Sequence, residues 1–147
     1  MSTRLLKTQA AAHFRFKLVN DRWSWGGQMD APTPTLLLLV HQANDDGNTP
    51  WPKIGPGRYR VEIAWPANVV GWDGTRPGAI ERREHAELLR QGHAVGRALL
   101  IDGTRNEAGE FHVAPIQDDA PVWRLENVTL DGDGIYRADA VHPKVAA

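Results

Sequence analysis

The fold is decided by the stretch Leu36-Leu37-Leu38-Leu39-Val40-His41-Gln42, in which the longest apolar run of the chain ends in polar residues. The apolar part has the length of a strand that is buried on both faces, and it falls far short of the roughly 20 residues needed to cross a membrane. A central strand is therefore expected over residues 36–42. Its polar end is expected to bring His41, Gln42 and the nearby Asn44 to one rim of the sheet.

Further strands are predicted around this run, because apolar and polar residues alternate in several stretches. In residues 58–65, Tyr59, Val61 and Ile63 alternate with charged residues, which indicates a strand with one buried face. Residues 44–57 are rich in Asn, Asp, Gly and Pro and predict a long loop of the kind that often carries function. The other strands are expected at residues 13–19, 95–101, 110–116, 123–130 and 135–138, with a hairpin turn at 131–134.

Two helices are expected beside these strands. The main helix is predicted over residues 78–91, with Gly92 as its C-cap. Its apolar stripe comprises Ile80, Leu88 and Leu89. A shorter helix, capped by Ser2 or Thr3, is expected to end at Ala12. The order of these elements predicts one α+β domain over residues 1–147, built on a mostly antiparallel sheet or a small barrel.

Length and composition indicate an ordinary globular protein. A chain of 147 residues suits a single domain, and the absence of cysteine excludes disulfides and thiolate zinc sites. No apolar stretch follows Arg4 and Lys7, so no secretory signal is visible. We therefore expect a cytoplasmic protein without a membrane partner.

The formal net charge of -1 argues against a nucleic-acid partner, because DNA-binding domains are usually basic. Basic residues nevertheless gather at Arg58 with Arg60, at Arg76, and at Arg82 with Arg83. The acidic residues gather in loop-like stretches at 45–46, 118–119 and 131–133. One hypothesis is therefore a basic face, in which Arg58, Arg60, Arg76 and Arg82 contact phosphates around the mouth of a pocket.

The six tryptophans suggest where such a pocket lies. Trp23 and Trp25 fall in the run Asn20-Asp21-Arg22-Trp23-Ser24-Trp25-Gly26-Gly27, and on a strand they would share one face as an aromatic wall. The glycines that follow allow a backbone or a ligand to approach closely. Such a wall suits a flat, partly polar ligand such as a nucleobase, with Trp65 as a third candidate. The alternative is that these tryptophans pack in the core.

Signals for enzymatic chemistry are weak. His85 and His93 do not form a zinc-binding pair on one helical face, and the chain has neither a nucleophile-elbow motif nor a phosphate-binding loop. Adjacent aspartates in a loop are usually solvated rather than catalytic. We therefore expect no metal, no cofactor and no catalytic residue.

Three segments together resemble a known family. They are residues 18–26 around Arg22-Trp23-Ser24-Trp25-Gly26, the strand that ends Val40-His41-Gln42, and the helical residues 78–92 that begin Gly78-Ala79-Ile80-Glu81-Arg82. This combination, spread over residues 14–136, is similar to a bacterial domain that often precedes HNH nuclease domains and resembles PUA-like, SRA-type readers of modified DNA bases. The resemblance implies a small curved barrel with flanking helices.

The resemblance also implies a function. A base of the 5-methylcytosine type would be flipped out of the duplex, stacked on aromatic rings and read along its Watson–Crick edge. Trp23 and Trp25 become candidates for the pocket wall, and Gln42 for a polar reader. Relatives commonly have Trp at the position of His41 and an acidic residue at the position of Ala43, where Asn44 supplies a nearby amide. These departures leave open which base is read.

The resulting expectation is a stand-alone reader that binds double-stranded DNA carrying a modified base. No HNH motif follows the matching segments, so we expect binding without cleavage, with a separate nuclease as a possible further partner. Two other classes stay open. One is a small-molecule or RNA-nucleotide binder on the same barrel, since a fold does not fix a function. The other is a nucleic-acid-processing hydrolase that uses His41, His112 and the loop acids.

Overall fold

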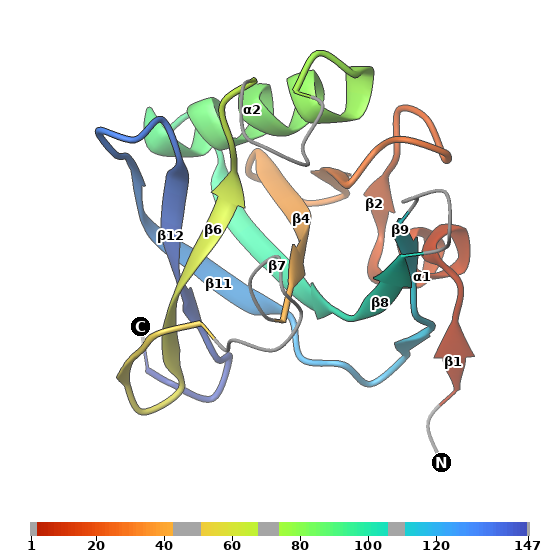
Figure 1. Cartoon of the computed structure of the whole chain (residues 1–147). Coiled ribbons are helices and arrows are strands. Elements are labelled where there is room, and N and C mark those ends of the chain that lie inside the picture. The colour runs from red at the N-terminus through yellow and green to blue at the C-terminus, as the bar shows by residue number, and fades with distance from the viewer. Residues whose placement is uncertain (1–2, 43–50, 68–73, 106–110, 147) are drawn as a thin grey trace.

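An eight-stranded, mostly antiparallel sheet organises the part of the chain that the computed structural model describes, residues 3–42, 51–67, 74–105 and 111–146. The strands run in the order β2-β3-β4-β7-β11-β12-β6-β5, and β4 and β7 form its one parallel pair in these residues (Figure 1). Their bounds are β2 Phe16–Lys17, β3 Gly26–Met29, β4 Thr35–His41, β5 Lys53–Gly55, β6 Arg58–Ala64, β7 Val95–Ile101, β11 Trp123–Leu130 and β12 Tyr136–Val141. The α+β class and the mostly antiparallel sheet are confirmed.

Two small two-stranded sheets and two helices complete the described residues. The pairs are β1 (Arg4–Leu5) with β10 (Ile116–Gln117), and β8 (Gly103–Arg105) with β9 (Phe111–Val113). The helices are α1 (Lys7–Phe14) and α2 (Pro77–Arg90). In the described residues, no helix combines the length and apolar character that crossing a membrane requires.

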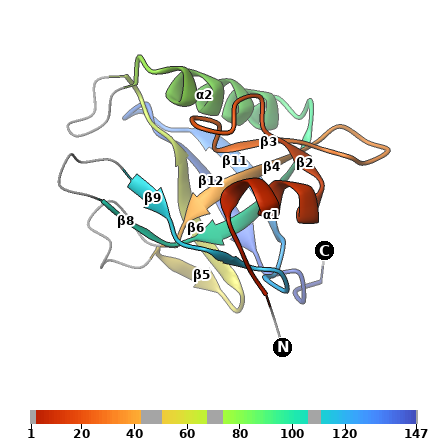
Figure 2. The same ribbon diagram turned by 90° about the vertical axis from the view of Figure 1, so that its right-hand side faces the viewer.

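Strand β4 separates two hydrophobic cores, because successive side chains of a strand point to opposite faces. Leu36, Leu38 and Val40 pack in the core that includes Ala86 and Leu89 of α2. Leu37 and Leu39 pack in the core that includes Ala10 and Ala11 of α1. The two helices therefore cover opposite faces of β4, and Figure 2 shows α1 in front of the strands with α2 across the top. The prediction of a central strand is confirmed.

The strands at 58–65, 95–101 and 123–130 and the helix at 78–91 are also found within one residue of their predicted bounds. The N-terminal prediction is wrong, because residues 4–5 pair with β10 and the helix begins only at Lys7. It extends to Phe14, and Arg15 adopts a left-handed conformation with φ 60°, which leaves a short β2. The predicted strand at 110–116 is divided between β9 and β10. Of the predicted long loop, residues 51–57 are described and contain β5.

The buried face of α2 differs from its predicted apolar stripe. Ile80 and Leu88 are each 42% exposed, whereas Glu81 and Arg82 are buried together with Ala86 and Leu89. A helix normally turns its charges to water. Here backbone carbonyl oxygens of β4 and β6 accept hydrogen bonds from the buried Arg82 side chain. With Arg82 facing the sheet, Ile80 and Leu88 lie on the solvent side of α2.

The sheet is not closed into a barrel. In the described residues β2 and β5 are its two edges, although β4 and β6 approach each other across the curve of the sheet. The β3–β4 ladder ends at Leu38, opposite Gly26, and the β5–β6 ladder extends only from Arg58 to Tyr59. The ends of β4 and β6 therefore face each other without a ladder, and we call this gap the seam.

A first prediction concerns Gly27 in β3. A Cβ atom at this position would lie 1.8 Å from the carbonyl oxygen of Lys17 in β2, so the backbone must move. We expect Gly27→Ala to lower the free energy of unfolding by roughly 1–3 kcal/mol in a urea titration. Gly132→Ala is the matched control, because a Cβ there meets nothing within 4 Å. Equal stability of the two variants would contradict the close approach of β2 and β3.

Candidate functional site

Residues 20–25, which we call the Trp loop, form a turn rather than a strand. The side-chain oxygen Oδ1 of Asn20 accepts hydrogen bonds from the backbone N–H groups of Arg22 (2.9 Å) and Trp23 (3.3 Å). The backbone N–H of Ser24 donates to the carbonyl oxygen of Asn20 at 2.9 Å. Strand β3 begins only at Gly26, so the prediction that Trp23 and Trp25 share one face of a strand is wrong.

The glycines next to the tryptophans serve close backbone packing. A Cβ on Gly26 would lie 2.4 Å from the carbonyl oxygen of Leu37 in β4, and a Cβ on Gly78 would lie 2.4 Å from the carbonyl oxygen of Trp23. Gly26 therefore lets β3 pair with β4, and Gly78 lets the first turn of α2 touch the Trp loop. These contacts explain both glycines without a ligand.

A buried polar pair joins the Trp loop to α2. Ser24 is fully buried, and its hydroxyl donates to Oε2 of Glu81 at 3.3 Å while accepting the backbone N–H of Asn20 at 3.0 Å. Burial raises the pKa of Glu81 above its usual value, because the charged carboxylate loses water. The hydrogen bond from Ser24 and the positive charges of Arg82 and Lys7 act in the opposite direction.

Arg82 connects three separate segments through its guanidinium group. It donates to the carbonyl oxygens of Ile63 in β6 (Nε, 2.5 Å), Trp25 in the Trp loop (Nη1, 2.7 Å) and Leu39 in β4 (Nη2, 2.7 Å). The residue is only 5% exposed, and burial lowers its pKa to about 9. The prediction that Arg82 belongs to a phosphate-binding face is therefore wrong, because its side chain is used inside the protein.

The seam between β4 and β6 is bridged by side chains. Arg82 joins Ile63 to Leu39, and Trp51 donates its indole N–H to the carbonyl oxygen of His41 at 2.6 Å. Trp51 itself is buried. Carbonyl groups at the end of β4 thus find partners that no neighbouring strand supplies, as buried backbone groups require.

At the end of β4, two of the predicted pocket residues meet. The rings of Trp25 and His41 have centroids 6.1 Å apart and an interplanar angle of 47°. Both side chains are partly exposed. The ammonium group of Lys7, the first residue of α1, lies 5.4 Å from the centroid of the Trp25 ring, within the range of a cation–π contact. We call Lys7, Trp25 and His41 the ring site.

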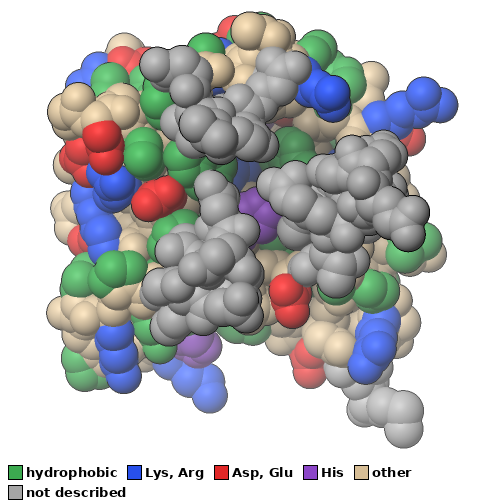
Figure 3. Space-filling model, viewed as in Figure 1, with side chains coloured by type: hydrophobic (Ala, Val, Ile, Leu, Met, Phe, Trp, Pro, Cys, Tyr) green, Lys and Arg blue, Asp and Glu red, His purple; other side chains and the backbone are tan. Residues whose placement is uncertain are grey.

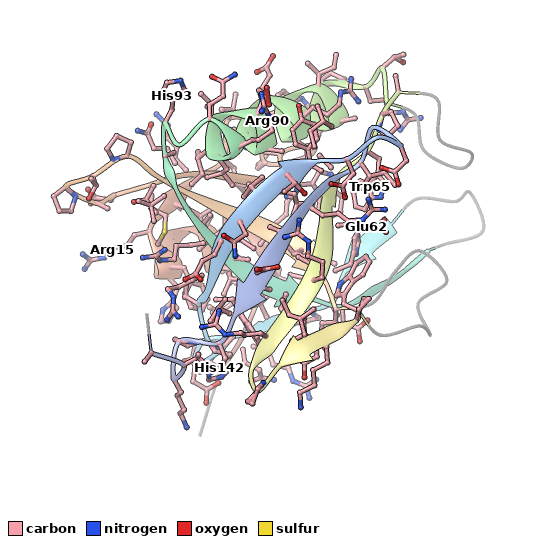
Figure 4. All side chains as sticks on the ribbon, turned by 90° about the vertical axis from the view of Figure 1, so that its left-hand side faces the viewer. Arg15, Glu62, Trp65, Arg90, His93 and His142 are labelled. Carbon is pink, nitrogen blue, oxygen red and sulfur yellow. The ribbon has the colours of Figure 1, made fainter. Side chains whose placement is uncertain are left out.

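The other predicted pocket residues have separate surroundings. Trp65 is buried and donates its indole N–H to Oε1 of Glu62 at 2.8 Å, and Figure 4 shows these two residues together near the end of β6. Trp23 is partly exposed where the Trp loop meets α2. Gln42 is exposed directly after β4, and its backbone N–H donates to the carbonyl oxygen of Ile101. Asn44 lies outside the described residues.

Two of the predicted phosphate-binding arginines are held by carboxylates on the outer face of the sheet. Arg60 forms an ion pair with Asp139 at 2.9 Å and donates to the hydroxyl of Thr129 at 2.6 Å. Arg58 lies 3.6 Å from Glu126. Arg76 is exposed immediately before α2. On the face seen in Figure 3, the described Lys and Arg side chains lie mostly toward the margins, so a concentrated basic patch is not visible there.

Sequence reasoning assigned no role to Lys7, Ser24, Glu81 or His85. Burial and the charge of Arg82 lower the pKa of His85 to about 4, so its imidazole is neutral near pH 7. The only sequence signal for Ser24 is its position as a small polar residue between two tryptophans, and Glu81 has no signal, because the burial of its neighbour Arg82 depends on distant partners. Among the described residues, no group of three or more His, Asp or Glu could hold a metal ion.

Comparisons of the chain with protein-family models, with curated proteins and with solved structures gave no match.

A second prediction tests the seam. Arg82→Met keeps an unbranched apolar stem but removes the donor to the carbonyl oxygens of Ile63 and Leu39, whereas the carbonyl of Trp25 keeps the N–H of Leu39. We expect a loss of about 2 kcal/mol or more in the free energy of unfolding, because each buried acceptor without a partner costs about 1–3 kcal/mol. Arg4→Met, at an exposed position on β1, should change stability by less than about 0.5 kcal/mol. Similar melting curves for both variants would contradict the bridging role.

A third prediction concerns the pH dependence of stability. Because the pKa of Glu81 is higher in the folded protein than in the unfolded chain, the folded state binds its proton more tightly. Glu81 therefore stabilises the fold most below its unfolded pKa, and this contribution is lost as the pH rises through the raised folded value. We expect Glu81→Gln to gain melting temperature relative to the wild type as the pH increases from 4 toward 7. Asp30→Asn, at an exposed position directly after β3 and not among the groups that act on Glu81, should show no such trend.

Proposed function

We propose that the protein binds a modified base of the 5-methylcytosine type in double-stranded DNA, and that it stacks the flipped base between Trp25 and His41. The observation that carries this proposal is the meeting of these two rings, at 6.1 Å, from segments that are far from adjacent in the sequence. An indole and an imidazole on the rim of a sheet offer two flat faces to one planar ligand.

The ring spacing is close to what such a ligand needs. A base between two parallel rings requires about 7 Å between their centroids, because each stacked pair is about 3.5 Å apart. The observed separation of 6.1 Å and tilt of 47° mean that one ring must turn to become parallel. His41 suits this movement, since its backbone carbonyl is held by Trp51 while its side chain is partly exposed.

Gln42 is the proposed reader of the base edge. It follows His41 at the rim and is exposed, with its backbone held by Ile101. An amide supplies a donor and an acceptor together and can match a base without adding a charge. Asn44 is kept in the proposal as a second amide on the strength of its position in the sequence.

The charge distribution favours a second candidate, a module that binds a free modified nucleoside or an RNA nucleotide. Arg82 is buried, and Arg58 and Arg60 are engaged with carboxylates, so three of the expected phosphate contacts have internal partners. Each phosphate that a protein neutralises contributes about -0.9 to the slope of log affinity against log salt for duplex DNA. Duplex binding by this protein should therefore depend weakly on salt, with stacking as the main source of affinity.

A fourth prediction tests the ring pair directly. Trp25→Leu and His41→Leu should each weaken binding to a 5-methylcytosine duplex by about 5-fold or more, because stacking contributes about 1–3 kcal/mol per base. Fluorescence anisotropy with modified and unmodified duplexes measures this effect. His142→Leu is the matched control, because its ring also contacts a tryptophan, Trp123 of β11, at 5.0 Å, but lies directly after β12 near the C-terminus (Figure 4).

The outcomes separate the candidates. Preference for the modified duplex that both ring variants lose and the control keeps would support the reader. Binding of 5-methylcytidine alone, with equal weak binding of both duplexes, would favour the nucleoside-binding module. Unchanged affinity in both ring variants would remove Trp25 and His41 from the site.

A further inference from the structure

The first residue of α1 contacts the Trp loop and the Trp25 ring at the same time. The Nζ atom of Lys7 donates to the carbonyl oxygens of Arg22 at 3.3 Å and Ser24 at 3.1 Å, and it lies 5.4 Å from the centroid of the Trp25 ring. These two hydrogen bonds connect α1 to residues that lie 15 and 17 positions after Lys7 in the chain. Lys7 is thus a cation fixed against one side of the indole by backbone oxygens.

Further contacts hold Trp25. The backbone carbonyl of Trp25 accepts from Arg82 and from the N–H of Leu39, so its main chain is held on β4. Its side chain packs against the core under α1, and the His41 ring lies 6.1 Å away. In the proposed complex, the base stacks on Trp25 beside His41.

We propose that Lys7 is a positioning residue, which holds the Trp25 ring in the orientation that presents it to a base beside His41. This inference rests on the proposed function. Lys7 acts through Trp25 and touches neither the base nor a phosphate. Asp21 and Glu81 are the carboxylates whose charges act on the ammonium group, and burial works against them by lowering its pKa.

The partly buried position of Lys7 fits this role better than a role in contacting DNA. A solvent-exposed lysine attracts phosphates through its charge, whereas the ammonium group of Lys7 is directed to two carbonyls and a ring inside the protein. A partly buried cation–π contact contributes about 0.7–1.4 kcal/mol, between the values for exposed and for desolvated pairs. The expected loss of ligand affinity on removing the cation is therefore about 3- to 10-fold.

A double-mutant cycle tests the inference. Lys7→Gln keeps N–H donors for the two carbonyls but removes the charge, and Lys7→Met removes both. Each should reduce the preference for a 5-methylcytosine duplex over the unmodified duplex by about 3- to 10-fold in the wild-type background and by less than about 2-fold in the Trp25→Leu background. Equal losses in both backgrounds would show that Lys7 acts independently of Trp25 and would overturn the proposal. Lys17→Met, an exposed lysine on β2, is the matched control and should leave the preference unchanged.

A readout without DNA keeps this inference separate from the proposed function. With fluorinated tryptophan incorporated, the ¹⁹F NMR signal of Trp25 is identified as the one that disappears in Trp25→Phe. Lys7→Gln should shift that signal and leave in place the signal of Trp123, which is on β11 and contacts Tyr59 and His142. If Lys7→Gln shifts the signal but the wild-type protein shows no preference for the modified duplex, the positioning role of Lys7 is supported and the reader function is rejected. An unshifted signal would overturn the positioning role, whatever the DNA result.

Discussion

The buried guanidinium group of Arg82 is the interaction on which the remaining arrangement depends, because it ties α2 to carbonyl oxygens in β4, β6 and the Trp loop. Burying a charge is unfavourable unless hydrogen bonds replace its water. Here three backbone oxygens do so, and in return the ends of two strands gain donors that the sheet does not supply. Arg82 and Trp51 thus bridge the seam, where β4 and β6 have no ladder in the described residues.

The same contact joins two of the three sequence segments on which the expected resemblance was based. The Trp loop and the start of α2 touch directly, since Ser24 donates to Glu81, Arg82 donates to Trp25, and Gly78 fits against the carbonyl of Trp23. These residue types suit close packing between a turn and a helix. They inform on the fold more than on any ligand. In the proposed reader, specificity would come from residues at the rim such as His41, where this chain departs from the resemblance.

Local patterns were sufficient for β4, β6, β7, β11 and α2, because their alternation or helical period is contained in neighbouring residues. They failed for Arg82, whose partners lie 19, 43 and 57 positions away in the chain. A charge in an amphipathic helix indicates an exposed face until such partners are known. The pairing of β1 with β10 was equally inaccessible, since it joins the two halves of the chain. Of the candidate site, the position of His41 at the end of the central strand was predicted, whereas the contacts of Trp25 with His41 and with Lys7 have no local signal.

The contacts that hold Trp25 have a consequence for the proposed binding. Trp25 is held through its backbone, its packing and Lys7, and the backbone carbonyl of His41 is held by Trp51. A preorganised ring lowers the entropy lost on binding. Arg82 is bonded both to Trp25 and to Leu39, two residues before His41 in β4. The backbone that positions both rings is thus set by the same buried charge that spans the seam, so the geometry of the site and the curvature of the sheet must change together.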